Sequence, residues 1–325
     1  GQFAPAEAPP GLNLTNLRLR LPAARLAEAA GLADVVNIEA YRPVNLLDEI
    51  QGQVVAGNIT SVASKTVASG PGYLAWLDGK GFSQDPAAYP LVDVIDDGID
   101  TGDAANVAHP DFYRLGVKPG TDRVAYIANC TADATGNGAG GHGNLNAGIL
   151  SGYNNLSGFP YENGAGYQYG LGISPYGQVA GTKIFSNTGG LDLSKCNGSD
   201  TTFIQNSYQM GARLTSDSWG ATAFGAYNVD AQMYDALTRD ATGAAGNQEM
   251  LHVFAAGNDG AGTGTINSPG TAKNVLTVGA AENPRDPGVS CNGWLDADSA
   301  DDIAFYSSRG PAADGRAKPD LVAPG

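Results

Sequence analysis

The chain has 325 residues, of which 42% are hydrophobic and 16% are charged, and this is enough for one large domain or two small ones with a substantial core. Its 33 acidic and 18 basic side chains give a formal net charge of −15, the wrong sign for holding phosphates, so nucleic acid and anionic membranes are excluded as expected partners. No run of about 18 apolar residues predicts a membrane span.

The N-terminal part of the chain predicts a small β-α-β unit. Residues 17–21 alternate like a half-buried strand, residues 22–30 are rich in Ala and Leu and end at Gly31 like a helix, and residues 35–39 form a second strand pattern. The small, polar stretch 58–72 predicts a linker before a larger second unit.

From residue 91 onward, apolar β-branched runs alternate with Gly-rich turns and helical segments. Such near-continuous apolar strands are typical of a buried parallel sheet, so the predicted fold class is α/β, with helices on both faces of the sheet. The predicted strands are 91–95, 123–128, 179–185, 251–255 and 275–278, and the predicted helices are 199–212 and 228–242.

Three polar side chains stand where such a fold builds sites. Asp96 follows the first strand of the predicted sheet, at its carboxyl end. His142 lies between glycines at the start of an apolar helix, where its imidazole is accessible and can take a proton at neutral pH. Asn258 follows another strand, where its amide can donate a hydrogen bond to a developing oxyanion. Taken singly, each has a structural alternative as a turn cap, a structural histidine or a turn residue.

Six segments, in their order along the chain, resemble the subtilisin-like serine peptidases, the subtilase family. The segments are VIDDGID at 94–100, GHGNLNAGI at 141–149, SDSWG at 216–220, FAAGNDG at 254–260, VLTVGAA at 275–281 and FYSSRGPAADGRAKPDLVAPG at 305–325. The resemblance implies a three-layer fold around a central, mostly parallel sheet, with the catalytic domain at 91–325. It implies that residues 1–90 are a prodomain-like segment and linker; the alternative is an ordinary N-terminal extension.

By this resemblance Asp96 matches the triad aspartate, His142 the general base and Asn258 the oxyanion-hole asparagine. Asp96 would orient and stabilise the imidazolium of His142, which takes the proton of the nucleophile and passes it to the leaving amine. Ser218, Trp219 and Gly220 resemble the strand whose backbone pairs with an extended substrate. Trp219 either walls a substrate pocket or packs in the core.

The nucleophile of the family is a serine in a GTSxA-type segment that follows the APG motif, and the sequence contains no such segment. Ser307 and Ser308 belong to the SSRGP motif and are not candidates. We therefore expect an endopeptidase for protein or peptide substrates whose serine lies beyond Gly325 or on a bound C-terminal fragment, and expect this chain alone to be inactive. The rival hypothesis is a pseudopeptidase that binds extended peptides, against which the retained catalytic side chains argue. A metallopeptidase is set aside because no HExxH set is present.

The motifs depart from the family pattern at three places. Asp97 stands where the family has a small hydroxyl residue, and strand alternation predicts that it points to solvent or to a cation. Residues 144–146 read Asn-Leu-Asn instead of Thr-x-Val, which affects the expected local packing. Asp100 and Asp103 precede an HPD turn that contains Asp111; the alternatives are a structural calcium site and a solvated acidic loop, and the spacing favours the loop.

The cysteines and the composition predict a secreted protein. Cys130, Cys196 and Cys291 form no CxxC pair, so a zinc ribbon and a thioredoxin-type motif are excluded. The acidic, Gly-rich and Lys-poor composition favours secretion, where one disulfide can form. Three cysteines leave one thiol unpaired within this chain, and the pairing stays open.

Overall fold

The computed structural model describes residues 21–35, 49–284 and 297–325, and the chain divides into two compact units, residues 1–45 and 46–325. In the first unit a 3-10 turn at Ala23–Arg25 leads into helix α1, Leu26–Ala30, which ends before Gly31. This confirms the predicted N-terminal helix. The two strands predicted beside it lie almost entirely outside the described residues.

The second unit begins with short elements that precede the sheet. They are helix α2 (Ile50–Val55), strands β1 (Ile59–Val62) and β2 (Lys65–Ala68), and helix α3 (Tyr73–Gly79). The prediction of an irregular linker at residues 58–72 is wrong, because β1 and β2 within it form an antiparallel hairpin. Ala63 and Ser64 both have positive φ (50° and 67°), as a two-residue turn that matches strand twist requires. The assignment of residues 1–90 to a prodomain stays a prediction.

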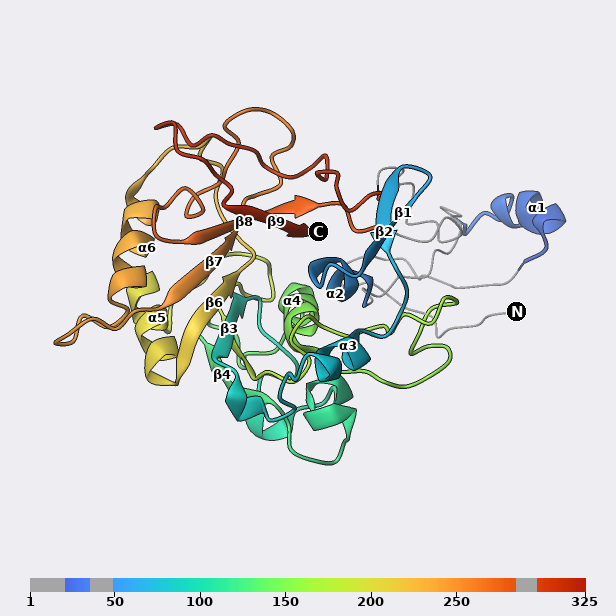
Figure 1. Ribbon diagram of the computed structural model, residues 1–325, viewed down its shortest axis with the longest axis horizontal. Coiled ribbons are helices and arrows are strands. Elements are labelled where there is room, and N and C mark those ends of the chain that lie inside the picture. Colours follow the sequence, from blue (N-terminus) through green and yellow to red (C-terminus); the bar gives the residue numbers. More distant parts are fainter. Residues whose placement is uncertain (1–20, 36–48, 285–296) are drawn as a thin grey trace. The chain divides into compact units, whose positions relative to one another are not determined.

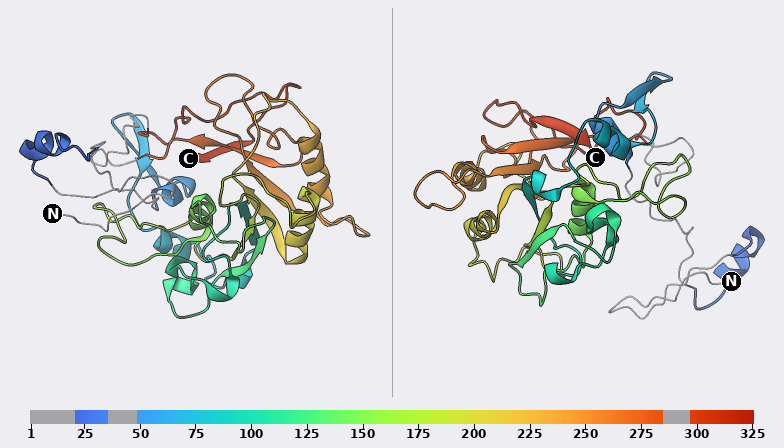
Figure 2. Two further views of the ribbon diagram at one scale, coloured as in Figure 1. Left: turned by 180° about the vertical axis from the view of Figure 1, so that it is seen from behind. Right: turned by 60° about the horizontal axis from the view of Figure 1, so that its bottom comes forward.

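The centre of this unit is a seven-stranded sheet in the order β4-β5-β3-β6-β7-β8-β9, and every pairing in it is parallel (Figures 1 and 2). The strands are β3 (Leu91–Asp96), β4 (Val124–Asn129), β5 (Val179–Lys183), β6 (Ala212–Asp217), β7 (Leu251–Ala255), β8 (Leu276–Ala281) and β9 (Leu321–Pro324). The predicted α/β fold is therefore confirmed. Strands β6 and β9 were not predicted from the pattern. In β6, polar side chains interrupt the apolar run that marks the predicted strands.

Helices cover both faces of this sheet, α4 (His142–Ser151) on one face and α5 (Asp200–Gln209) and α6 (Val229–Arg239) on the other (Figure 1). Val94 packs in the same buried cluster as Ala147 of α4, whereas its neighbour Ile95 packs with Phe203 of α5. Because successive side chains of a strand point to opposite faces, Asp96 lies on the same face as Val94 and is directed towards α4.

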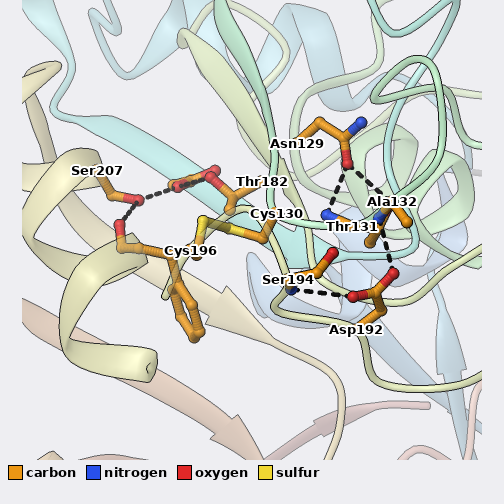
Figure 3. Close-up of a disulfide and its surroundings, with 11 residues drawn as sticks. Asn129, Cys130, Thr131, Ala132, Thr182, Asp192, Ser194, Cys196 and Ser207 are labelled. Carbon is orange, nitrogen blue, oxygen red and sulfur yellow. Dashed lines mark hydrogen bonds between the residues drawn. A yellow bond between two sulfur atoms is a disulfide. The ribbon is translucent and has the colours of Figure 1, made fainter. Parts of the chain in front are cut away.

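A disulfide joins two loops at the carboxyl side of the sheet. Cys130 follows β4 directly, and Cys196 lies four residues before α5. The two cysteines are 66 residues apart in sequence and form the disulfide (Figure 3). Both cysteines are buried, and the amide of Lys195 donates to the carbonyl of Cys130 at 2.8 Å. The third cysteine, Cys291, lies outside the described residues. In the described parts of the chain, no helix has the length and apolarity needed to cross a membrane.

Candidate active site

Asp96 and His142, which are 46 residues apart in sequence, form a hydrogen-bonded pair. Asp96 ends strand β3 and is only 2% exposed. His142 is the first residue of α4, and its Nδ1 lies 2.8 Å from both carboxylate oxygens of Asp96. A carboxylate accepts hydrogen bonds only, so Nδ1 carries the proton and Nε2 is the nitrogen that is left to exchange one. The structure thus brings together two of the predicted site residues.

The environment of His142 favours its protonated form. The hydrogen bond to Asp96 raises the pKa of His142 above its ordinary value, and the negative charges of Asp96 and Asp97 act in the same direction. Partial burial opposes this by favouring the neutral ring. The pair can therefore accept a proton and hold the resulting imidazolium, as a general base must.

Asp97 does not point to solvent or to a cation, as the alternation rule predicts, but caps helix α4. Its carboxylate accepts hydrogen bonds from the backbone amides of His142 (3.2 Å) and Gly143 (2.7 Å). The prediction was wrong because β3 ends at Asp96 and the chain turns at Gly98, which has a φ of 102°. A negative charge is favourable at this position, since the first amides of a helix lack partners within the helix. Lys183, fully buried at the end of β5, donates to the carbonyl of Asp97 at 2.6 Å and holds this turn.

Close backbone contact explains the glycine that follows His142. A Cβ atom on Gly143 would collide with the carbonyl oxygen of Gly98 and would lie 2.9 Å from the carboxylate of Asp97. Only a glycine therefore allows α4 to begin close enough to β3 for the imidazole to reach Asp96. The sequence predicts that the flanking glycines leave the ring accessible, and 55% of the His142 side chain is indeed exposed. Gly143 in addition permits the close approach of α4 to β3.

Gly143→Ala is expected to lower the free energy of unfolding by about 1–3 kcal/mol, because the new methyl group collides with backbone that cannot move freely. It should also impair any activity that needs the contact between the two side chains. Gly148→Ala in the same helix is the matched control, since a methyl group there would meet no other part of the fold within 4 Å, and it should be neutral or stabilising by about 0.5–1 kcal/mol. Urea unfolding of both variants measures the difference, and equal stabilities would contradict the steric explanation.

Asn146 is a further polar neighbour of the pair that sequence reasoning did not identify. Its Nδ2 lies 2.8 Å from Oδ2 of Asp96. The motif comparison indicated only altered packing at this position. The signal that could have identified it is its spacing, because residues four apart on a helix lie on the same face, here the face of His142.

The other predicted site residues follow strands next to β3. Ser218, Trp219 and Gly220 follow β6, which pairs with β3, and Asn258 follows β7, which pairs with β6. The register pairs Val94 with Ser216, which places Ser218 level with Asp96. Since all three strands are parallel, their carboxyl ends meet at one edge of the sheet, where α/β proteins bind ligands. Asn258 is exposed there.

Comparison with known proteins decides the family. The model of the subtilase family matches residues 88–325. The chain belongs to the subtilase family. The resemblance drawn from the six motifs is thereby confirmed.

The chain matches two curated relatives over short stretches and spans only a small part of their length. It is 44% identical over 87 residues to pyrolysin of Pyrococcus furiosus, covering 23% of this chain and 6% of that protein. It is 38% identical over 100 residues to the serine protease AprX of Bacillus subtilis, covering 31% of this chain and 20% of that protein. Among solved structures, a psychrophilic subtilisin-like protease from Pseudoalteromonas sp. AS-11 aligns with 77% of this chain and 44% of that chain at 17% identity and a TM-score of 0.48.

In this subtilase the two serines of the SSRGP motif have structural contacts. Both Ser307 and Ser308 are buried. The Oγ of Ser308 accepts a hydrogen bond from the amide of Asp259 at 3.1 Å, and the amide of Ser308 donates to the carbonyl of Gly257 at 2.9 Å. These bonds flank Asn258 on both sides and hold its loop at the edge of the sheet.

Trp219 packs against aromatic side chains of the core. Its ring centroid lies 5.2 Å from that of Phe254, 6.0 Å from that of Tyr234 and 6.4 Å from that of Phe185, each in an edge-to-face arrangement. These contacts are typical of aromatic pairs in protein cores. Of the two alternatives for Trp219, they favour the packed core residue.

The acidic loop before the HPD turn organises its own backbone. The carboxylate of Asp100 accepts hydrogen bonds from the amides of Ala108 (2.6 Å) and His109 (2.9 Å), and Asp103 accepts one from Ala105 at 2.9 Å. Burial raises the pKa of Asp111 to about 6 against the opposing charges of nearby basic groups. Within the described ranges, these three carboxylates do not converge on one point as metal ligands would. The solvated acidic loop stays the favoured expectation, and a structural calcium ion stays the alternative.

Proposed function

We propose that the chain carries the aspartate and the histidine of a serine endopeptidase, and that the nucleophilic serine lies beyond Gly325 or on a second fragment of the same gene product. Membership of the subtilase family supports a serine peptidase. The observation that carries the proposal is the pair of 2.8 Å contacts between Nδ1 of His142 and the buried carboxylate of Asp96. A protein that only held peptides would need neither side chain.

The proposed reaction uses each group at a defined atom. Asp96 accepts a hydrogen bond from the Nδ1–H group of His142, so that Nε2 can take the proton of the serine hydroxyl while the serine oxygen attacks the peptide carbonyl. The negative oxygen that forms is stabilised by an amide hydrogen bond from Asn258. The imidazolium then gives its proton to the leaving amine, and water cleaves the acyl-enzyme by the same steps in reverse.

The substrate would be bound as an extended strand. Ser218 to Gly220 directly follow Asp217, the last residue of β6, and we expect their backbone groups to pair with a peptide by strand addition. Protein or peptide substrates are therefore proposed. Secretion is proposed as well, and the disulfide between Cys130 and Cys196 supports it, since such bonds persist in oxidising compartments.

A fluorophosphonate probe tests this function, because it labels only a serine that is activated by a working base. The full gene product is expected to be labelled on a serine outside residues 1–325, and the label should be lost in His142→Ala. His109→Ala is the matched control, since this histidine is exposed, with 61% of its side chain accessible, and its ring contacts Asp111 of its own turn; it should be labelled like the wild type. Peptide mass mapping locates the label and identifies any fragment that co-purifies. An intact, folded gene product that stays unlabelled would support the pseudopeptidase.

A further inference from the structure

We infer that Asn146 is a positioning residue of the catalytic pair, whose side-chain amide holds the carboxylate of Asp96 in the orientation that faces His142. The inference rests on the proposed function for its catalytic meaning. It concerns a place where this chain departs from the usual family motif, which has an apolar valine at the fourth position after the histidine.

The hydrogen bonds to Asp96 show what the amide contributes. Oδ1 of Asp96 accepts from the amide of Asp97 at 2.7 Å and from Nδ1 of His142 at 2.8 Å. Oδ2 accepts from the same Nδ1 at 2.8 Å and from Nδ2 of Asn146 at 2.8 Å. Of these two donors to Oδ2, only Asn146 is not shared with Oδ1. Without it, this buried oxygen would share the imidazole hydrogen with Oδ1, and the carboxylate could rotate away from its present plane.

The orientation of the Asn146 amide follows from the same contacts. Its Nδ2 lies 3.3 Å from Nδ1 of His142, but Nδ1 carries a hydrogen that it donates to Asp96, so it cannot accept a hydrogen bond from Nδ2. The contact therefore places two donors side by side on one carboxylate. A flipped amide would set its oxygen against Oδ2 of Asp96, which is repulsive, so only the observed orientation is compatible with an ionised Asp96.

Asn144, the other asparagine of the motif, makes different hydrogen bonds. Its Nδ2 donates to the carbonyl of Gly138 at 2.8 Å, and its Oδ1 accepts from the amide of Asp100 at 2.6 Å. Through these two bonds it joins two loops, and both polar atoms of its side chain are used away from Asp96 and His142. The positioning role therefore belongs to Asn146 and is not shared by the asparagines of this motif in general.

The donor on Asp96 also affects how the pair titrates. A hydrogen bond to a carboxylate stabilises its negative charge, so less of that charge is available to stabilise the imidazolium of His142. The positive end of the amide, beside the ring, acts in the same direction. Loss of the amide is therefore expected to raise the pKa of His142 further. The titratable groups around the pair, which the variants leave unchanged, are Asp97 after β3, Lys183 at the end of β5 and Asp217 at the end of β6, and burial raises the pKa of Asp217 well above its ordinary value.

Asn146→Leu tests the inference, because leucine keeps the approximate volume and removes the donor. In the full gene product, the midpoint of the acid limb of kcat/KM is expected to rise by about 0.5–1 pH unit, with a fall in kcat of about tenfold at the optimum. Asn146→Val, which restores the residue usual in the family, should shift the midpoint in the same direction. Asn146→Asp should shift it further, since it adds a negative charge next to Asp96. A residue with only a packing role would change kcat or the melting temperature and leave the midpoint in place.

Titration of the histidine ring protons by NMR gives a readout that does not require hydrolysis. The chain has three histidines, and His109→Ala assigns one of them, while the fully buried His252 has its pKa lowered to about 4 by burial. A raised midpoint for His142 in Asn146→Leu supports the positioning role even if the wild type proves not to be a peptidase. An unchanged midpoint in folded Asn146→Leu and Asn146→Val would overturn the inference, whatever the activity of the wild type.

Discussion

Replacement of His142 with alanine is expected to lower kcat for peptide hydrolysis by about 10⁶-fold. The variant lacks the imidazole that is hydrogen-bonded to Asp96 and is proposed to take the proton of the serine. Asp96→Asn should lower kcat by about 10⁴-fold. Its amide can donate a hydrogen bond to Nδ1, which places the ring hydrogen on Nε2 and leaves no base facing the serine. KM should change little in either variant, since neither side chain is expected to hold the ground-state substrate.

The measurement is steady-state hydrolysis of a chromogenic peptide by the full gene product, with protein folding checked by circular dichroism. His109→Ala is again the matched control and should retain wild-type kcat. His142→Ala with kcat within about tenfold of the wild type would refute the assignment, because loss of a general base lowers the rate by about 10²-fold at the least. Residual activity above the uncatalysed rate is expected from the oxyanion hole and substrate binding alone.

Loss of the disulfide between Cys130 and Cys196 is expected to lower the free energy of unfolding by about 4 kcal/mol. The bond joins residues that are 66 positions apart. In the chain-entropy description, closing a loop of this length lowers the conformational entropy of the unfolded chain, which destabilises that state by about 4 kcal/mol. The bond also joins the loop after β4 to the segment before α5 (Figure 3), so its loss should loosen one edge of the sheet.

Urea unfolding with and without reductant measures this contribution. Reductant should move the wild-type midpoint to lower urea, and it should have no effect on the double variant Cys130→Ser, Cys196→Ser, which serves as the matched control. If the wild type and the double variant unfold at the same urea concentration without reductant, the disulfide does not contribute in the expected way.

Five of the seven strands of the sheet were predictable because each is a largely apolar run between turn residues, as in β3 and β7. β6 was hidden because Thr215 and Asp217 interrupt its apolar pattern, and both side chains are buried against other polar groups: Thr215 contacts His252 of β7 at 2.9 Å. Polar side chains can be buried in a strand only when hydrogen-bond partners satisfy them. Those partners come from elsewhere in the chain, and local sequence does not reveal them.

The candidate site was suggested partly by position and partly by resemblance. Asp96, His142 and Asn258 each stand at the end of a strand or the start of a helix, and their roles were assigned by the resemblance to the subtilase family. The contact between the first two depends on Gly143, which lets α4 approach β3, and on Asp97, which caps the helix. Both interactions join segments that are far apart along the chain, and their direction is invisible in a linear pattern.

The sequence by itself therefore determined the fold class, the order of the motifs and the identity of the side chains that can carry chemistry, because these depend on local periodicity and on residue type. Only the tertiary structure decided that Asp97 caps a helix instead of facing solvent or a cation, that Cys130 pairs with Cys196, and that Asn146 donates to Asp96. Each of these depends on two segments that are distant in sequence and meet in space, where hydrogen-bond geometry and close packing select one partner from the several that residue type allows.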